Sequence, residues 1–539
     1  MALQEAGRGT PALDHRRSVI SAAFIPLFSA SALGWSIASR MTPLAHRTGF
    51  IRSAARAVNR RTANRKCDTQ VMFDQQAKTL NTRFYFGVFA VLTAIGFLAP
   101  IRVGDLPGYD DARYTVVAKQ IVLSGDWLNT QYNGSPDFEH PPLLEWIQAA
   151  FFSVFGISDF VAKVPSALLG LGTVLLVARL ARRLTGDPLQ GILAMFALAS
   201  SAYFVKYTAR AMTDVPVTFF FLAALCAWSL TEEHPGWYLA AGAFTAMALM
   251  TRGLIGFALP AIFGLDLIIA RRRPRWSYAL AGLAVAILPL ALWYWRLIHH
   301  YGQVFFAAHE AWLDREAFGA LSPSWRRYTG LFEYVFMLAK SYWPWLPFAI
   351  AGMVTLIRER QRRLYVLLIW FVVVLAMCAA AKSRVLRYVL PAYPALSILT
   401  AIGLVALIPV RFIVKGLLFA TPVLAVAVLA IAIFPPVIHH ATEIQPIAVA
   451  ATAVTPSGER IAFYDQGAPL YDEVNQMLWY GGREILFLLS PGELEQALET
   501  RKTRVFVVDD ATYQAHFSSR IGHEIVAKAG HLMCVRLNP

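Results

Sequence analysis

Long apolar blocks dominate this 539-residue sequence and leave few folds open to it. The hydrocarbon core of a bilayer is about 30 Å thick, and a helix needs roughly 20 apolar residues to cross it. Blocks of this kind recur eleven times between residues 84 and 434. Only 15% of the residues are charged, whereas a soluble domain has about a quarter. The sequence therefore predicts an all-α polytopic membrane protein with about eleven transmembrane helices.

The predicted spans lie near residues 84–101, 161–179, 189–205, 215–230, 237–250, 254–270, 277–297, 342–357, 364–381, 391–408 and 416–434. A further apolar segment, 143–157, is short and contains Glu145 and Gln148. We therefore predict that 143–157 lies in the membrane interface without spanning it.

Basic residues test this topology, because short cytoplasmic loops carry an excess of Lys and Arg. With eleven spans and a cytoplasmic N-terminus, four short basic segments fall on the cytoplasmic side: 179–183, 271–275, 358–363 and 411–415. If 143–157 also spanned the membrane, all four segments would move to the outer face. The outer face then receives a long first loop, 102–160, and the region after residue 434.

The N-terminal region, 1–71, is basic, with 11 basic residues against three acidic ones. We predict a disordered cytoplasmic extension here; the alternative is that 19–38 forms a signal sequence or a weak span. The rest of the basic charge is spread over loops and does not gather on a folded segment, which argues against nucleic-acid binding. The transmembrane domain is predicted to cover 72–434.

The C-terminal region, 435–539, is not apolar throughout and alternates two kinds of pattern. Segments 460–465, 484–489 and 504–509 are typical of strands. Segments 469–480 and 491–499 are typical of helices. Alternating strands and helices predict a small α/β domain on the outer face.

Polar and charged residues gather in the predicted outer loops. Such a cluster beside a membrane is energetically costly, so it indicates a functional site. The candidates are Asp110, Asp111, Arg113, Tyr114, Glu139, His140, Arg210, Asp214, Arg252, Arg384, Arg387 and Tyr388. A carboxylate there can deprotonate an acceptor hydroxyl, and an arginine can bind a phosphate through two hydrogen bonds. An apolar groove between helices could hold a lipid tail. These parts together suit group transfer from a lipid-linked phosphate donor.

Several of these segments form an ordered set of motifs. They are Asp110-Asp-Ala-Arg-Tyr114, Ser124-Gly-Asp-Trp127, Asn133-Gly134, Phe138-Glu-His-Pro-Pro142 and the segments 163–167, 209–214, 249–253 and 387–391. This set resembles the bacterial integral-membrane glycosyltransferases of the glycosyltransferase C fold, the lipid A aminoarabinose transferase and protein mannosyltransferase-like family. The resemblance runs from about 84 to 434, followed by the predicted outer domain.

The resemblance implies an enzyme of the bacterial inner membrane with a periplasmic active site. It implies a polyprenyl (undecaprenyl) phosphate sugar donor and a lipid A, glycan or protein acceptor. Asp110 matches the family's first-loop catalytic aspartate and would act as the base of an inverting displacement, and Asp214 matches the second-loop aspartate. The expected donor-phosphate contacts are Arg113, Tyr114, His140, Arg252, Arg384, Arg387 and Tyr388.

One position departs from the family pattern. The family has Lys where this chain has His140, and a histidine is largely neutral above about pH 6.5. This exchange weakens the electrostatic part of the expected contact with the donor phosphate. The resemblance also implies that a divalent metal ion could bind, with Glu139 and His309 at the positions of its ligands. Two protein ligands are fewer than the three or four that zinc sites usually have.

Each feature has a structural alternative. Asp110 and Asp111 could cap a helix, and Arg252, Arg384 and Arg387 could be interfacial anchors. The rival function is a transporter or flippase of a lipid-linked glycan. A transporter keeps its charged residues near the bilayer midplane, whereas the acidic residues here fall in outer loops.

Overall fold

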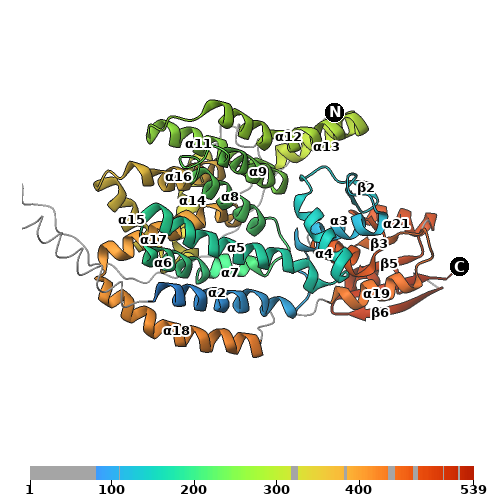
Figure 1. Ribbon diagram of the computed structural model, residues 1–539. Coiled ribbons are helices and arrows are strands. Elements are labelled where there is room, and N and C mark those ends of the chain that lie inside the picture. The colour runs from blue at the N-terminus through green and yellow to red at the C-terminus, as the bar shows by residue number, and fades with distance from the viewer. Residues whose placement is uncertain are drawn as a thin grey trace, which may run out of the picture. The chain divides into compact units, whose positions relative to one another are not determined.

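The computed structural model describes residues 81–538 apart from 109, 317–325, 382–384, 435–442, 465–470, 502 and 520–521. The described residues belong to one compact unit, Phe73–Pro539 (Figure 1). The predicted N-terminal extension, 1–71, lies outside them. The described chain divides into a helical part and a smaller part that contains a sheet.

Six stretches of the described chain are long and apolar enough to cross a membrane. They contain α2 (Thr82–Leu98), α5 (Asp159–Thr185), α12 (Trp276–Tyr301), α16 (Tyr365–Ala380), α17 (Tyr393–Leu407) and α18 (Val410–Ile433). The pair α6 (Pro188–Ala199) and α7 (Ala202–Thr208) makes a seventh if the 68° bend between them is one broken span.

Shorter apolar helices occupy the other predicted spans: α8 (Asp214–Ser229), α9 (Trp237–Thr251), α10 (Gly253–Gly256) with α11 (Ala258–Ile269), and α15 (Leu346–Arg358). Each of the eleven predicted blocks therefore lies on a helix or a helix pair. The number of helices that cross the membrane stays a prediction. Two helices, α13 (Gln303–Glu316) and α14 (Arg326–Ser341), form where only a loop was expected.

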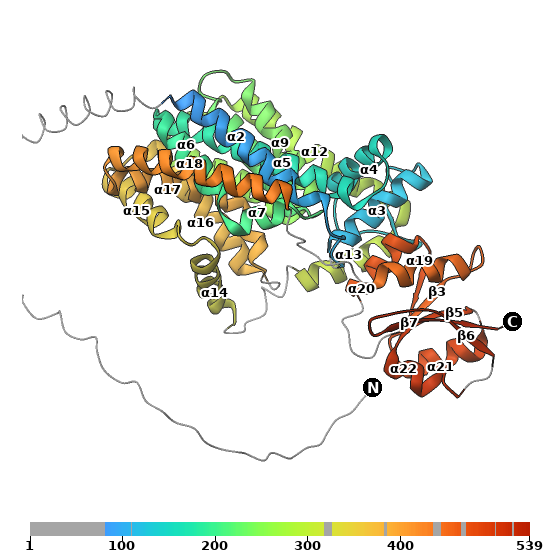
Figure 2. The ribbon, with the colours of Figure 1, turned by 90° about the horizontal axis from the view of Figure 1, so that it is seen from below.

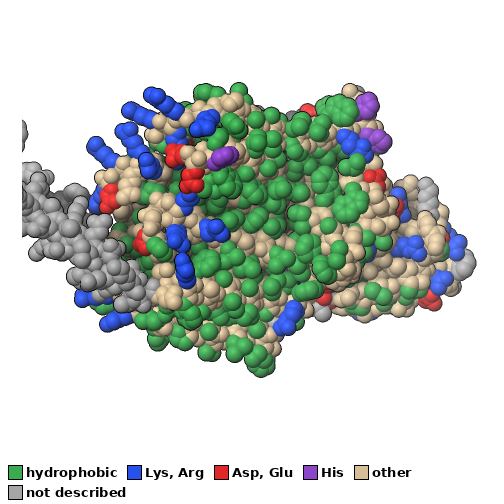
Figure 3. All heavy atoms as spheres, viewed as in Figure 1, with side chains coloured by type: hydrophobic (Ala, Val, Ile, Leu, Met, Phe, Trp, Pro, Cys, Tyr) green, Lys and Arg blue, Asp and Glu red, His purple; other side chains and the backbone are tan. Residues whose placement is uncertain are grey.

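The helices approach one another closely where glycines face each other. A Cβ on Gly352 of α15 would run into the carbonyl oxygen of Leu399 in α17, and one on Gly403 would run into that of Phe348. Small residues of this kind let membrane helices pack backbone to backbone. Away from these contacts, apolar side chains cover the outer surface of the helical part (Figure 3). A lipid environment accounts for such exposure.

Helix α3 (Asp110–Ser124) and helix α4 (Leu143–Phe155) form the first loop, joined by a hairpin of β1 (Gln131–Tyr132) and β2 (Ser135–Pro136). The hairpin turns at Asn133 and Gly134, whose φ angles are 50° and 75°. Positive φ at both central residues is what such a turn requires. Helix α4 covers the predicted interfacial segment with 13 residues, which span about 20 Å at 1.5 Å per residue.

The C-terminal residues form a mixed sheet of five strands in the order β4-β3-β5-β7-β6. The strands are β3 (Ile461–Tyr464), β4 (Ile485–Phe487), β5 (Val505–Asp509), β6 (His523–Ala529) and β7 (Leu532–Leu537). Strands β4, β3 and β5 run parallel, whereas β7 is antiparallel to β5 and β6. Helices α19 (Ile444–Val454), α20 (Tyr471–Gly481), α21 (Pro491–Thr500) and α22 (Asp510–His516) accompany it.

The predicted strands and helices of this region all form, and β6, β7, α19 and α22 add to them. This α/β unit lies against α3 and α4 (Figure 1; turned by 90° in Figure 2). Val116 and Phe152 share one buried cluster with Val474 and Trp479 of α20. The Trp479 indole also donates to Asp159 at 2.6 Å, at the start of α5. These contacts hold the unit firmly beside the first loop.

Candidate active site

Four helical ends meet beside the first loop and bring the candidate residues together. Asp110 is the first residue of α3, and Asp214 is the first residue of α8. Arg252 separates α9 from α10 with an extended backbone, and Arg387 lies in η4 (Leu386–Ala392). These side chains line one cavity of about 500 Å³. The ends of these helices therefore bring polar side chains together at one place in an otherwise apolar helical part.

Most of the predicted site residues share this cavity. Its lining includes Asp110, Arg113, Tyr114, Glu139, His140, Asp214, Arg252, Arg387 and Tyr388. Arg384 lies outside the described residues. His309 is described but does not belong to the lining.

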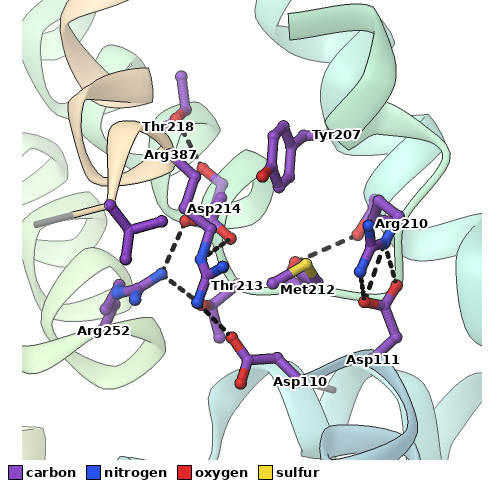
Figure 4. Close-up of polar contacts among 12 residues, drawn as sticks. Asp110, Asp111, Tyr207, Arg210, Met212, Thr213, Asp214, Thr218, Arg252 and Arg387 are labelled. Atoms are coloured by element: carbon purple, nitrogen blue, oxygen red, sulfur yellow. Dashed lines mark hydrogen bonds and ion pairs between the residues drawn. The ribbon is translucent and has the colours of Figure 1, made fainter. Parts of the chain in front are cut away.

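Two carboxylates and two guanidinium groups form a chain of ion pairs in the cavity (Figure 4). Arg387 Nη2 lies 2.7 Å from Asp110 Oδ2, and Arg387 Nε lies 3.8 Å from Asp214 Oδ2. Arg252 Nη1 lies 2.7 Å from Asp214 Oδ1 and 3.1 Å from Thr213 Oγ1. Asp214 thus pairs with both arginines, and its own side chain is only 1% exposed.

Asp110 keeps more access to the cavity than Asp214, with a side chain that is 19% exposed. Burial raises the pKa of Asp110 to about 6, although the guanidinium groups of Arg387 and Arg252 pull it down. The neighbouring carboxylate of Asp214 adds to the rise. A carboxylate with a pKa near 6 is ionised at neutral pH and is a stronger base than an ordinary aspartate.

The adjacent Asp111 points the other way (Figure 4). Its carboxylate accepts hydrogen bonds from Arg210 Nε at 2.9 Å and Nη2 at 2.5 Å, and from the Ala211 backbone at 2.8 Å. It is completely buried and does not line the cavity. Asp111 therefore ties α3 to the segment before α8, and only Asp110 faces the site.

Tyr388 supports both arginines with its ring. The guanidinium carbon of Arg252 lies 4.2 Å from the ring centroid, and that of Arg387 lies 5.5 Å from it. A guanidinium over an aromatic face is attracted to it and keeps its hydrogen-bonding edge free to turn toward a ligand. The two positive charges are thus held side by side at the cavity wall.

Arg113 lines the cavity but is already engaged by acidic residues. Its Nη2 lies 3.0 Å from Asp137 Oδ1 and 3.2 Å from Glu139 Oε2. Its guanidinium also lies over the ring of Tyr132 at 4.9 Å. A donor phosphate would have to compete with these carboxylates, so Arg252 and Arg387 are better placed to meet it.

His140 occupies the position where the family pattern has Lys. Burial, together with the charges of Arg113 and Arg252, lowers the pKa of His140 to about 3. The imidazole is therefore neutral at physiological pH. It can donate a hydrogen bond but adds no positive charge, as the sequence predicted for this exchange. Its ring lies 5.7 Å from that of the buried Tyr114.

The remaining wall of the cavity is apolar. Val217, Leu254, Ile255, Met377 and Pro391 line it. A wall of this kind, beside two guanidinium groups, suits a ligand with an anionic head and a hydrocarbon tail.

Comparison with known proteins identifies the architecture. The family of dolichyl-phosphate-mannose-protein mannosyltransferases matches residues 139–295. The undecaprenyl phosphate-alpha-4-amino-4-deoxy-L-arabinose arabinosyl transferase of Edwardsiella ictaluri is 28% identical over 338 residues, 58% of each chain. The solved structure of ArnT from Cupriavidus metallidurans bound to undecaprenyl phosphate has a TM-score of 0.66 at 18% identity and covers 85% of this chain and 98% of that one.

The chain shares the fold of ArnT, and its sequence is similar to the arabinosyl transferases and, over residues 139–295, to the protein mannosyltransferases. A more distant member of the same fold, the oligosaccharyltransferase AglB of Archaeoglobus fulgidus, has a TM-score of 0.51 at 12% identity, covering 80% of this chain and 70% of that one. The chain spans 58% to 65% of the length of the first curated relatives that it matches.

The two predicted metal ligands each have a partner within the structure. His309 Nδ1 lies 3.2 Å from the Phe138 carbonyl oxygen, and Nε2 lies 3.2 Å from the Tyr294 hydroxyl. Glu139 pairs with Arg113. Among the described residues, no group of three or more His, Cys, Asp or Glu is placed to hold a metal ion. Binding of one metal ion by both residues would require them to exchange these partners for the ion.

Two cavity residues, Tyr132 and Asn475, were not predicted from the sequence, and neither was Asp137, which lies behind the cavity wall. Asp137 is buried and pairs with Arg113, and Tyr132 comes from the hairpin. Asn475 comes from α20 of the C-terminal unit and accepts a hydrogen bond from the Tyr132 hydroxyl at 2.5 Å. Asp137 precedes the Phe138-Glu139 motif and could have been noticed there. Asn475 had no local signal, because only the docking of α20 brings it to the cavity.

Proposed function

We propose that this protein transfers a single sugar from an undecaprenyl phosphate-linked donor to an acceptor outside the inner membrane. The observation that carries the proposal is the Asp110 carboxylate beside the Arg252 and Arg387 guanidinium groups, in one cavity with an apolar wall. The relatives named for undecaprenyl phosphate sugar transfer support the donor class.

The reaction is an inverting displacement at the anomeric carbon. The acceptor hydroxyl gives its proton to an Asp110 carboxylate oxygen as its own oxygen forms the new bond to that carbon. The bond from the anomeric carbon to the phosphate oxygen breaks, and undecaprenyl phosphate leaves with the electron pair. A phosphate is a tolerable leaving group, so stabilising its growing negative charge matters more than protonating it.

Arg252 and Arg387 stabilise that charge, because both are rigidly held at the wall of the same cavity. His140 adds a neutral hydrogen bond to the phosphate. Asp214 acts through the arginines: it is buried beneath them and pairs with both. We therefore assign Asp214 the role of a residue that positions the two arginines, and not that of a residue that binds the acceptor.

Asp110 also pairs with Arg387, and this pair makes donor binding precede the deprotonation of the acceptor. The incoming phosphate draws Arg387 toward itself, which frees the Asp110 carboxylate to accept a proton from the acceptor. Donor binding thereby prepares the base. This coupling keeps the base masked when no donor is present.

We place the cavity on the periplasmic side. Helix α5 starts beside the α/β unit and carries Arg182 and Arg183 in its last turn, and its 27 residues span about 40 Å. Basic side chains gather at the end of the helical part away from the α/β unit (Figure 3). The excess of Lys and Arg that cytoplasmic loops carry supports a periplasmic position for the cavity and the α/β unit.

The acceptor we propose is a membrane lipid such as lipid A. The site is formed partly by α20, which lies outside the helical part and would meet a headgroup at the membrane surface. The experiment below distinguishes a lipid acceptor from a glycan or a protein acceptor.

The test is transfer of radiolabelled sugar in membranes that contain the wild type or Asp110→Asn at matched expression. Several undecaprenyl phosphate sugars serve as donors. We expect label in a lipid fraction with the wild type, and at least about a hundredfold less with Asp110→Asn. Label in a glycan or protein fraction would correct the acceptor. No transfer from any donor, with lipid-linked sugar still crossing the membrane, would support the rival flippase function.

A further inference from the structure

A larger hollow lies at the other end of the helical part. It has a volume of about 1010 Å³ and is formed by α2, α5, α6, α8 and α9. Phe86, Leu176, Ile192, Trp237 and Phe244 make its walls mostly apolar. We call it the basic groove, because Arg83, Arg179, Arg182 and Arg183 line it as well.

The basic groove is separate from the reaction cavity. Helix α8 begins at Asp214 in the cavity, and its last turn, with Cys226 and Ser229, lines the groove. The 16 residues of α8 span about 24 Å at 1.5 Å per residue. A ligand in the groove therefore lies near the opposite membrane surface from the reacting sugar.

The arginines of the groove differ in their partners. Arg183 Nη2 lies 2.7 Å from Glu233 Oε1 and also donates to the Ser229 carbonyl at 2.8 Å. Arg83, Arg179 and Arg182 are exposed, and within the described ranges no carboxylate forms an ion pair with them. Arg179 and Arg182 are three residues apart on α5, so they extend from the same helix face. The groove therefore has positive charge that its own acidic residues do not neutralise.

We propose that the basic groove binds an anionic phospholipid. The lipid phosphate meets Arg179 and Arg182 at the rim, and one acyl chain lies along the apolar wall beside Trp237 and Phe244. The match of charge and shape selects this occupant: the rim is cationic, the wall is apolar and the site opens at the membrane surface. A zwitterionic lipid would bring its own ammonium to the arginines and gain less.

Cytoplasmic loops carry basic residues for topology alone, so a matched control is needed. Arg273 and Arg275 belong to another basic loop at the α11–α12 connection and do not line the groove. Replacing them removes the same charge from the protein while leaving the groove intact.

The experiment is native mass spectrometry of the detergent-purified full chain titrated with phosphatidylglycerol, phosphatidylcholine or inorganic phosphate. We expect the wild type and R273Q/R275Q to bind phosphatidylglycerol equally and more tightly than phosphatidylcholine. We expect R179Q/R182Q to bind it about tenfold more weakly. Equal binding by R179Q/R182Q and wild type, an equal loss in R273Q/R275Q, or no preference for phosphatidylglycerol would overturn the proposal. Inorganic phosphate that displaces the lipid at equal concentration would also overturn it, because a plain anion site would suffice.

A second measurement covers the case in which R179Q/R182Q does not fold. Brominated phosphatidylglycerol quenches tryptophan fluorescence on contact, and Trp237 lines the groove. We expect the quenched fraction to fall in Trp237→Phe, compared with Trp295→Phe on an exposed face of α12. Equal quenching in the two variants would place the lipid elsewhere.

Discussion

Asp110 Oδ2 lies 2.7 Å from Arg387 Nη2, although 277 residues separate them in the chain. The pair joins the start of the first loop to the turn before α17. It places the proposed base and a proposed phosphate ligand in direct contact, so the fixed positive charge of Arg387 favours the ionised form of Asp110.

The pH dependence of transfer reports on this pair. Because the pKa of Asp110 is about 6, we expect kcat/KM to fall on the acid side with a midpoint near pH 6. The sign follows from the role of a base, which works only when deprotonated. Arg387→Gln removes a positive charge that lowers the pKa of Asp110, so the midpoint should move to higher pH. A profile that is flat between pH 5 and 8 in the wild type would contradict this role.

Asp110 and Asp111 make a matched pair of carboxylates. Asp110→Asn should abolish transfer while leaving the melting temperature close to that of the wild type. Asp111→Asn should lower stability by about 3 kcal/mol, because it leaves the buried Arg210 charge without its bidentate partner. Thermal unfolding in detergent and transfer assays on both variants check this division. The reverse pattern would exchange the two roles.

Arg252 offers a test of phosphate recognition. Arg252→Lys keeps the charge but loses the planar group that stacks on Tyr388 at 4.2 Å and reaches Asp214. We expect KM for the undecaprenyl phosphate sugar to rise about tenfold, an effect of about 1.4 kcal/mol. Arg183→Lys, in the basic groove, is the control and should leave KM unchanged. An unchanged KM in Arg252→Lys would remove Arg252 from the donor contact.

His140 should work without changing its charge. Its pKa of about 3 keeps it neutral throughout the working range. We therefore expect His140→Gln, which retains a hydrogen-bond donor, to keep activity within tenfold of wild type and to leave the acid limb in place. An ionisation near pH 6.5 that disappears in His140→Gln would show that the imidazole titrates after all.

Asn475 connects the C-terminal unit to the reaction cavity. Asn475→Ala removes the acceptor for the Tyr132 hydroxyl and opens space at the cavity wall. We expect KM for the acceptor to rise several-fold with a smaller change in kcat, because the residue lies apart from the ion pairs. Asn133→Ala, which loses hydrogen bonds to the Ile485 backbone outside the cavity lining, serves as a control for the stability of the same junction. Equal effects in both variants would assign Asn475 a purely structural role.

Local pattern was enough to predict much of this protein. The length and apolarity of the blocks predicted helices, because a helix is the way a single segment satisfies its backbone in lipid. The alternation in 460–465 and 504–509 predicted β3 and β5. The ordered motifs around Asp110, Glu139 and Arg387 indicated the resemblance to membrane glycosyltransferases. These motifs contain many of the polar residues that line the cavity. Each of these signals resides in neighbouring residues.

Tertiary structure decided what neighbours could not. Asp110 and Asp111 are the same residue type at adjacent positions, and only the orientation of α3 sends one toward Arg387 and the other toward Arg210. Asn475 enters the cavity because α20 docks on α3, a packing of apolar surfaces that no local motif encodes. The pKa of Asp110 likewise depends on burial and on arginines distant in the chain. Sequence therefore determined the elements and the chemical groups, whereas long-range packing determined which groups meet and with what charge.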